Sequence, residues 1–143
     1  RDSLLAILNR TAVAIKKFQD PKTGCWFQVL DKAGSKGNYV EASASCMFVY
    51  ALTKGVRLGY LPDAYFGVAA EGYAGILRQF IRKNPEGDIT LSGTVSVAGL
   101  GGEPYRDGSY KYYLSEKVID NDPKGVGAYL LAAGEMEMIK ITK

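Results

Sequence analysis

The sequence predicts a mainly α-helical protein built from helical hairpins with short β segments in the loops. Three observations indicate this fold class. Apolar residues recur at helical spacing in four long segments. Breakers that contain proline and glycine separate the segments, and Pro85 follows Pro21 by 64 positions in the same role. A helix, a breaker, an extended piece and a second helix therefore occur twice, which predicts two successive hairpins packed against each other.

The first predicted helix begins at Asp2 or Ser3, either of which is a good N-cap, and ends at Gln19. Its apolar stripe consists of Leu4, Leu8, Ala12 and Ile15. The breaker at 20–24 ends it, because proline disfavours helical geometry in the residue before it. Residues 25–30 then predict a short extended stretch.

Two further helices follow in the middle of the chain. Residues 41–58 have helical periodicity and begin with a run of small side chains, which suits a helix packed on several sides. Gly59 provides a stop after it. The third helix is predicted to begin at Pro62 or Asp63 and to continue as far as Lys83.

The last part of the chain repeats this pattern. Residues 84–88 form the second breaker, and 89–97 alternate apolar and small polar residues, which predicts a strand or hairpin arm. A long glycine-rich loop is predicted at 99–108. Asp122 and the proline after it cap a final helix, which runs over 124–139.

The composition limits the classes of function. With 143 residues, 47% hydrophobic and 23% charged, residues 1–143 are predicted to form a single domain. No apolar run approaches the roughly 20 residues that cross a bilayer, so no membrane interaction is predicted. The net charge of +3 is spread without a polybasic tract, and no nucleic-acid partner is predicted.

The chain contains no histidine. This removes Ser-His-Asp and Cys-His catalysis, together with histidine-based metal sites. Neither a metal nor a cofactor is predicted. Cys25 and Cys46 have neither zinc-ribbon nor Cys-x-x-Cys spacing, so buried free thiols are favoured over a disulfide.

Four segments in order resemble one enzyme family. The segments 19–31, 39–48, 112–114 and 122–128 are similar to the C-terminal part of the unsaturated rhamnogalacturonyl hydrolases of glycoside hydrolase family 105, which are related to family 88. The resemblance spans nearly the whole chain. It implies that the chain is the C-terminal portion of an (α/α)6 barrel of six helical hairpins, with the substrate at one mouth.

The resemblance also implies a reaction and a substrate. In this family an aspartic acid protonates the C4=C5 double bond of a terminal unsaturated uronic acid, and water adds at carbon 5. The hemiketal that results collapses and releases the sugar, without a cofactor. The chemistry requires a carboxylic acid that stays protonated near neutral pH. The expected partner is a pectin-derived oligosaccharide with an unsaturated uronate end.

The departure from the family pattern concerns catalysis. The family's acid lies in a His-x-Trp-Asp segment upstream of the region that matches, and a chain without histidine cannot hold that segment. No catalytic residue is therefore predicted, and the chain alone is expected to be inactive. Asp107 and Asp122 are the carboxylates that could substitute, but a turn role for Asp107 and a cap role for Asp122 are favoured.

Seven residues are candidates for contact with the substrate: Trp26, Gln28, Glu41, Ser43, Tyr105, Arg106 and Lys124. An aromatic ring and an amide suit a sugar, although a tryptophan can equally fill a gap between helices. Arginine can form a bidentate pair with a uronate carboxylate. Glu41 and Ser43 stand where a capping box is an alternative role, and Lys124 stands where it opposes the helix dipole.

Two other functions remain open at this point. The chain could be a helical-hairpin module that binds a carbohydrate or a protein without catalysis, or part of another (α/α)-barrel enzyme such as a polysaccharide lyase. Because two hairpins leave one side of the array uncovered, self-association is expected through the helices at 41–58 and 124–139. The abrupt start at Arg1 suggests a chain cut from a longer one.

Overall fold

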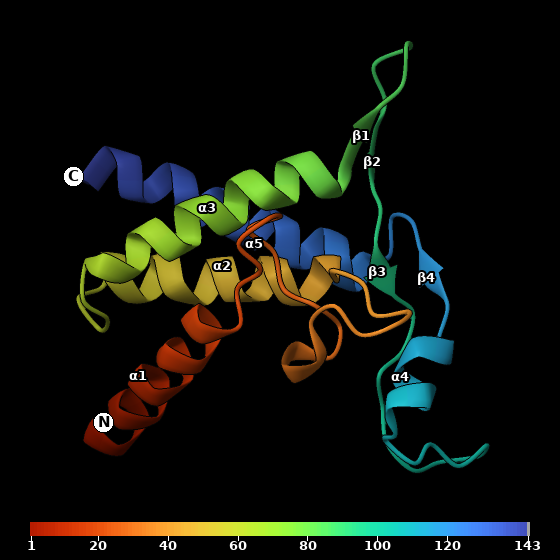
Figure 1. Cartoon of the computed structure of the whole chain (residues 1–143). Coiled ribbons are helices and arrows are strands. Elements are labelled where there is room, and N and C mark those ends of the chain that lie inside the picture. Colours follow the sequence, from red (N-terminus) through yellow and green to blue (C-terminus); the bar gives the residue numbers. More distant parts are fainter. Residues whose placement is uncertain (143) are drawn as a thin grey trace.

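The computed structural model describes residues 1–142, and most of them are helical (Figure 1). In chain order the elements are α1 (Asp2–Lys17), the 3-10 helix η1 (Leu30–Lys32), α2 (Ala42–Arg57), α3 (Ala64–Gln79), β1 (Ile81–Lys83), β2 (Ile89–Leu91), β3 (Thr94–Val95), α4 (Tyr110–Ser115), β4 (Val118–Ile119) and α5 (Pro123–Thr142). The four long helices confirm the predicted ones, and the β segments lie in the connections, as expected.

Two boundaries differ from the sequence prediction. The third helix ends at Gln79, because residues 81–83 form β1 and pair antiparallel with β2 across the turn at 84–88. The predicted strand at 89–97 is divided into β2 and β3, and β3 pairs antiparallel with β4. The short helix α4 was not predicted. Its cap is Ser109, whose hydroxyl accepts a hydrogen bond from the Tyr112 amide.

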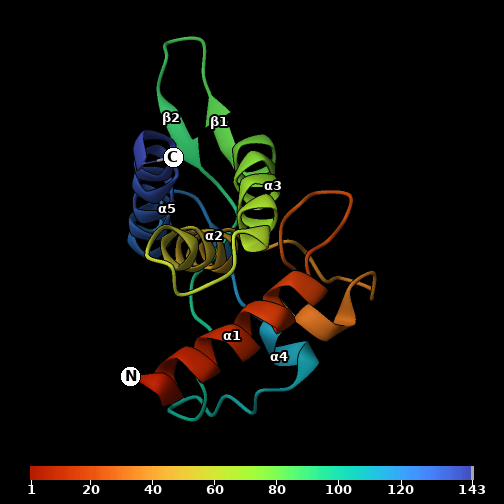
Figure 2. The same cartoon turned by 90° about the vertical axis from the view of Figure 1, so that its left-hand side faces the viewer.

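Helices α2, α3 and α5 pack together, and α2 contacts both of the others. Helices α2 and α5 run in the same direction and α3 runs in the opposite one (Figure 1). Seen along these helices, α1 crosses on the side of α2 away from α5 (Figure 2). This arrangement has the pattern of an (α/α) barrel, with α2 and α5 as parallel neighbours and α3 as the antiparallel helix that covers them.

The core lies where the first breaker packs against α2 and α3. Trp26 is fully buried, and its ring meets Phe48 edge to face at a centroid distance of 5.4 Å. Glycines in α3 allow this close approach. A methyl group at Gly72 would lie 2.9 Å from the Trp26 ring, and one at Gly75 would collide with the Thr23 carbonyl.

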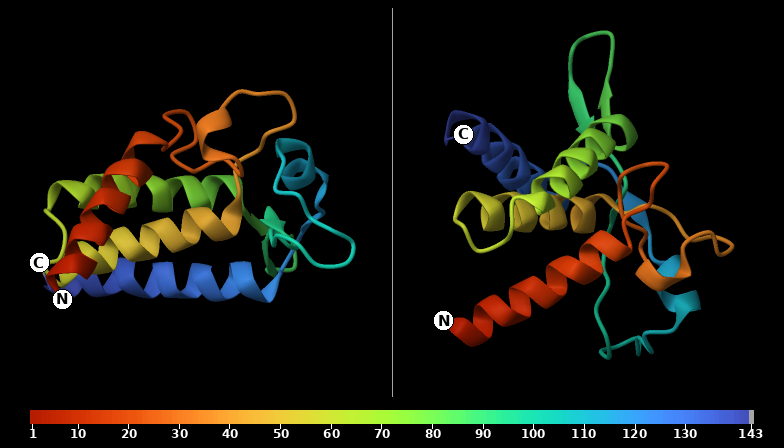
Figure 3. Two further views of the ribbon diagram at one scale, coloured as in Figure 1. Left: turned by 90° about the horizontal axis from the view of Figure 1, so that it is seen from below. Right: turned by 60° about the vertical axis from the view of Figure 1, so that its left-hand side comes forward.

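The loops gather at one end of the helices, where α2 and α5 begin. Figure 3 shows η1, α4 and the loop before α4 together at this end. The β1–β2 hairpin is separate and projects away from the helices (Figure 1). Within residues 1–142, no helix combines the length and the apolar character that a bilayer crossing demands.

Candidate functional site

The candidate site is the end of the structure at which two parallel helices start. We call it the mouth and define it as residues 41–43, 122–124 and the glycine-rich loop at 99–108. The start of a helix carries about half a positive charge from its unpaired backbone N–H groups. Because α2 and α5 both begin here, the two partial positive charges lie at the same end of the molecule.

Glu41 closes the start of α2. Its carboxylate accepts hydrogen bonds from the amides of Ala44 at 2.6 Å and Val95 at 3.0 Å, and from the Ser43 hydroxyl at 3.0 Å. The residue is only 1% exposed. In this structure the Glu41 carboxylate is the N-cap that ties β3 to α2, and its contact with substrate stays a prediction. Ser43, next to Glu41, is half-buried, and its contact with substrate stays a prediction.

Asp122 and Lys124 form a pair at the start of α5. Asp122 accepts from the Lys124 amide at 2.8 Å and from the Lys124 ammonium group at 2.6 Å. The hydrogen bond to Lys124 lowers the pKa of the nearly buried Asp122 carboxyl below its ordinary value of 3.8. Asp122 is thus an ionised cap, the opposite of a protonated catalytic acid. Lys124 remains about half exposed and faces solvent at the mouth.

The pairing of Asp122 makes the stability depend on pH. Because the folded-state pKa lies below the unfolded value, the stabilisation is present above about pH 3.8 and is lost as pH falls through the folded pKa. We expect Asp122→Asn to lower the free energy of unfolding near neutral pH. The difference in the free energy of unfolding between this variant and the parent chain should then become smaller below about pH 4. Urea titrations at pH 7, 5, 4 and 3 measure this difference. A difference that grows in acid would contradict the role of ionised Asp122 as a stabilising cap.

Arg106, on the glycine-rich loop of the mouth, belongs to a second group of polar side chains. Its Nε lies 3.7 Å from Oε1 of Glu116, and both side chains are partly buried. Burial, followed by the nearby charge of Glu116, raises the pKa of Tyr112. Burial also raises the pKa of Tyr39, with Glu41 and Glu116 adding to it. The Tyr39 hydroxyl is buried and has no hydrogen-bond partner among the described residues.

Sequence reasoning singled out Arg106 but not the three residues around it. Tyr39 and Tyr112 lie inside the segments that carry the family resemblance, and that position was the available signal. Glu116 gave no local signal, because only the fold of the loop brings its carboxylate to Arg106. The charge of Arg106 is therefore partly neutralised before any substrate arrives.

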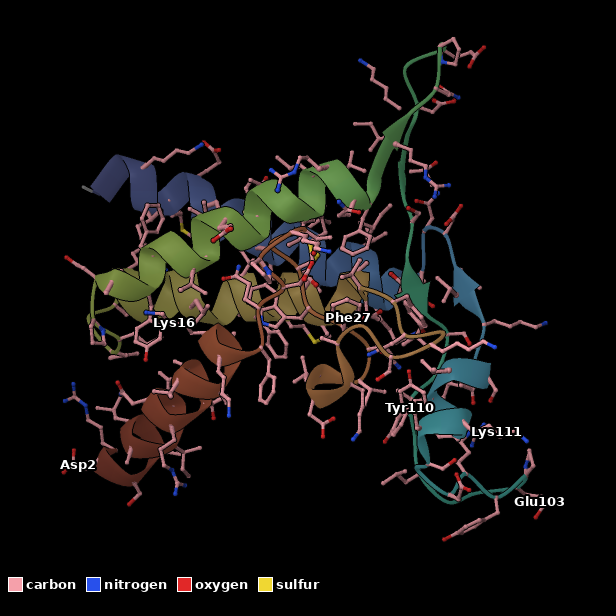
Figure 4. All side chains as sticks on the ribbon, in the orientation of Figure 1. Asp2, Lys16, Phe27, Glu103, Tyr110 and Lys111 are labelled. Atoms are coloured by element: carbon pink, nitrogen blue, oxygen red, sulfur yellow. The ribbon has the colours of Figure 1, made fainter. Side chains whose placement is uncertain are left out.

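The glycine-rich loop turns back on itself between Gly101 and Arg106, whose backbones pair in both directions. Tyr105 is 78% exposed on this turn, and its ring is free to meet a ligand. Asp107 accepts from the Ser109 amide, and this hydrogen bond lowers the pKa of its carboxyl. Figure 4 shows Glu103 at the outer tip of the loop.

Trp26 does not lie at the mouth surface. Its Nε1 donates to the Ile15 carbonyl at 2.7 Å, and no part of the residue is exposed. In this structure the tryptophan fills the gap between α1, α2 and α3, and its contact with substrate stays a prediction. Gln28 is half-buried, and its backbone N–H donates to the Tyr39 carbonyl. This bond sets the backbone of Gln28 beside that of Tyr39.

A shallow apolar groove runs from the mouth along the seam between α2 and α5. It encloses about 340 Å³ and is lined by Met47, Tyr50, Pro123, Lys124, Gly127, Ala128 and Leu131. Farther along the same seam, Arg57 makes a bidentate bond to the buried carboxylate of Glu135, at 2.7 and 3.0 Å. This ion pair fixes α2 and α5 relative to each other.

The two cysteines are buried free thiols, as predicted. Burial raises the pKa of Cys25 to about 11 and that of Cys46 to about 12, so neither is an activated nucleophile. Within the described part of the chain, no group of three or more cysteine, aspartate or glutamate side chains is arranged to hold a metal ion.

The sequence is similar to that of a known family and to two curated proteins. The profile described as Glycosyl Hydrolase Family 88 matches residues 1–140. Protein Atu3128 of Agrobacterium fabrum and the 24.9 kDa protein in picA locus of Rhizobium radiobacter are each 43% identical over 120 residues. These residues make up 80% of this chain and 52% of each relative. The chain thus spans about half the length of the curated relatives it matches.

Solved structures that are similar to this chain also include glycoside hydrolases. A glycoside hydrolase from family 105 of C. acetobutylicum superposes with a TM-score of 0.92 and 50% identity, over 95% of this chain and 38% of that one. A possible member of the family from Klebsiella pneumoniae gives a TM-score of 0.76 and 28% identity, over 94% and 31%. The helical hairpins are part of an (α/α)6 barrel, and the chain belongs to glycosyl hydrolase family 88, with family 105 enzymes as its structural relatives.

Proposed function

We propose that this chain is the C-terminal portion of an enzyme that removes a terminal unsaturated uronic acid from pectin-derived oligosaccharides. The enzyme would do so by hydrating the C4=C5 double bond. Family membership supports a glycoside hydrolase and places a polysaccharide lyase second. The finer assignment of substrate and reaction depends on the segments that resemble the unsaturated rhamnogalacturonyl hydrolases.

The observation that carries the proposal is the combination of cations and an exposed aromatic ring at the mouth. Lys124, about half exposed, and Arg106, partly buried, belong to the mouth, and the ring of Tyr105 is exposed on its glycine-rich loop. A uronic acid combines a carboxylate with a sugar face, and these groups suit both features. In this proposal Arg106 and Lys124 bind the acid, and Tyr105, Gln28 and Ser43 contact the sugar.

We propose further that this chain supplies binding groups but no proton donor. The acid in this reaction must stay protonated near neutral pH. Hydrogen bonds lower the pKa values of both Asp107 and Asp122, which is the wrong direction for that task. Glu41 is committed to three hydrogen bonds. The donor would then come from residues outside this chain.

The test is an activity assay on two proteins. The chain of 143 residues and the full product of its parent reading frame are each mixed with an unsaturated rhamnogalacturonan disaccharide. Hydration of the double bond removes its near-ultraviolet absorbance. We expect loss of absorbance with the full product and none with the chain. Activity of the chain alone would overturn the missing-donor proposal, and an inactive but folded full product would overturn the substrate assignment.

A variant pair in the full product tests the binding role. Arg106→Gln should raise KM for the uronate-ended disaccharide about tenfold or more, because a charge-assisted hydrogen bond contributes roughly 1.5–3 kcal/mol. Arg82→Gln, on the exposed hairpin strand β1, is the matched control and should leave KM unchanged. An unchanged KM for Arg106→Gln would remove Arg106 from the proposed site.

A further inference from the structure

Arg106 stands on a loop that holds its backbone more firmly than its side chain. Hydrogen bonds in both directions between Gly101 and Arg106 close the turn, but they involve only the main chain. The guanidinium extends over Gly102, where a methyl group would lie 3.1 Å from its Nη1 atom and where the sequence has no side chain. A long arginine side chain loses much rotamer freedom when it is fixed, so it needs a partner to hold one pose.

Glu116, the ion-pair partner of Arg106, stands on backbone that is fixed on both sides. It caps the C-terminal end of α4, and the carbonyl of Lys117 after it accepts a hydrogen bond from the Ser96 amide at 2.8 Å. Helix α4 is in turn attached to the loop before α2, because the Tyr110 hydroxyl donates to the Lys36 carbonyl at 3.1 Å (Figure 4). The carboxylate therefore extends from a well-anchored segment toward a less constrained loop.

Two phenols restrict the Glu116 side chain further. The hydroxyls of Tyr39 and Tyr112 are buried and complete no hydrogen bond among the described residues. Burial raises the pKa of both phenols, and the charge of Glu116 adds to the shift at each. The Tyr112 hydroxyl approaches the carboxylate without completing a hydrogen bond of normal geometry. The carboxylate thus lies among groups that stabilise it and limit where it can point.

The contact between the two charged groups is made at one edge of the guanidinium. Oε1 of Glu116 lies 3.7 Å from Nε of Arg106, and the two side chains are 20% and 30% exposed. The terminal nitrogens Nη1 and Nη2 form the fork with which an arginine can bind a carboxylate through two parallel hydrogen bonds. A partner at Nε can therefore orient this fork without occupying it.

We propose that Glu116 is a positioning residue for Arg106: it holds the Nε edge of the guanidinium and thereby presents the terminal nitrogens to the carboxylate of a uronic acid. The inference rests on the proposed function, in which Arg106 binds that acid. Residues that lock the rotamer of a binding group are what gives such a group its precision, above all when it stands on a loop.

The length of the Glu116 side chain is the property on which this role depends. At 3.7 Å the contact is already longer than a hydrogen bond, so a side chain shorter by one methylene group would lose it. A role through charge alone would have a different dependence. The negative charge would then repel the uronate, and its removal would strengthen binding whatever the length of the side chain.

Binding of a ligand that the enzyme cannot consume tests the positioning role. The full product of the parent reading frame is titrated by calorimetry with the saturated disaccharide of galacturonic acid and rhamnose, which has the carboxylate but no double bond to hydrate. Glu116→Asp keeps the charge and draws it back from Nε. We expect about two- to tenfold weaker binding, because ordering of the freed arginine side chain then opposes it. Glu116→Gln keeps the length and an acceptor oxygen and should bind at least as tightly as the parent.

The methyl ester of the same disaccharide separates positioning from a general loss of structure. The ester has no charge for Arg106 to bind, so Glu116→Asp should bind it as the parent does. In an Arg106→Gln background, Glu116→Asp should cause no further loss for the acid, since Glu116 acts through Arg106. Unchanged affinity of Glu116→Asp for the acid would overturn the proposal, and so would an equal loss for the acid and the ester.

Glu86→Asp is the matched control, because it makes the same change at the exposed turn between β1 and β2. It should leave the affinity for both ligands unchanged. Circular dichroism verifies that each variant is folded. A loss for Glu116→Gln as large as that for Glu116→Asp would show that the length of the side chain is not decisive, and would also overturn the positioning role.

An activity assay on the same preparations separates this inference from the proposed function. If the parent binds the saturated acid in the expected way but leaves the absorbance of the unsaturated disaccharide unchanged, the proposed reaction is wrong and the positioning role stands. If a folded parent does not bind the saturated acid, the positioning role is overturned. Loss of absorbance in that second case would still support the proposed reaction.

Discussion

Glu41→Ala is expected to lower the free energy of unfolding by about 3 kcal/mol. Loss of an N-cap costs about 1 kcal/mol, and leaving the buried amide of Val95 without a partner costs roughly 1–3 kcal/mol more. Urea titration at one fixed chain concentration measures the change.

Ser43→Ala is the control for Glu41. Its hydroxyl only donates to the Glu41 carboxylate, and losing it leaves both amide bonds in place. We expect a loss below about 1 kcal/mol. Glu41→Gln should fall between the two, since the amide oxygen can accept one of the two backbone bonds. Equal losses for Glu41→Ala and Ser43→Ala would mean that Glu41 does not connect β3 to α2.

Gly75→Ala is expected to destabilise the fold by roughly 2–3 kcal/mol or more. The added methyl group would collide with the Thr23 carbonyl and lie 2.9 Å from the sulfur of Cys25. The carbonyl belongs to the backbone of the first breaker, so no side-chain rotation can relieve the contact. Thermal unfolding followed by circular dichroism measures the loss.

Gly67→Ala is the control for Gly75→Ala, because Gly67 lies two turns earlier on the same helix. Its methyl group would meet nothing within 4 Å, so the substitution should stabilise the helix by about 0.5–1 kcal/mol through propensity alone. Opposite signs for the two variants are the expected result. A stabilising Gly75→Ala would contradict the close approach of α3 to the breaker.

The helices could be predicted from sequence because their signals are local. Periodic apolar residues, caps and breakers locate α1, α2 and α5 within one or two residues of the predicted start. The end of α3 was missed because Ile81 continues the helical period. Only pairing with Leu91, ten positions later, makes that segment a strand. Strand pairing is non-local and leaves no mark in the helical pattern.

The candidate site also has a part that local sequence signals predict and a part that depends on contacts between distant segments. The loop position of Tyr105 and Arg106 follows from glycine content, and the structure leaves the Tyr105 ring exposed. Trp26 stands just after a breaker, as a loop residue would, but the small residues of α3 open a space that its ring fills. That space is created by Gly72, 46 positions away. Burial of this kind depends on packing between distant segments and cannot be read from composition.

The projecting β1–β2 hairpin offers a place for a reporter group. Its turn at 84–88 is exposed and, in the views of Figures 1 and 2, stands clear of the helices. Exposed turns of this kind tolerate insertions and attached labels. A fluorophore or a short epitope placed at Glu86 would therefore leave the packed helices undisturbed.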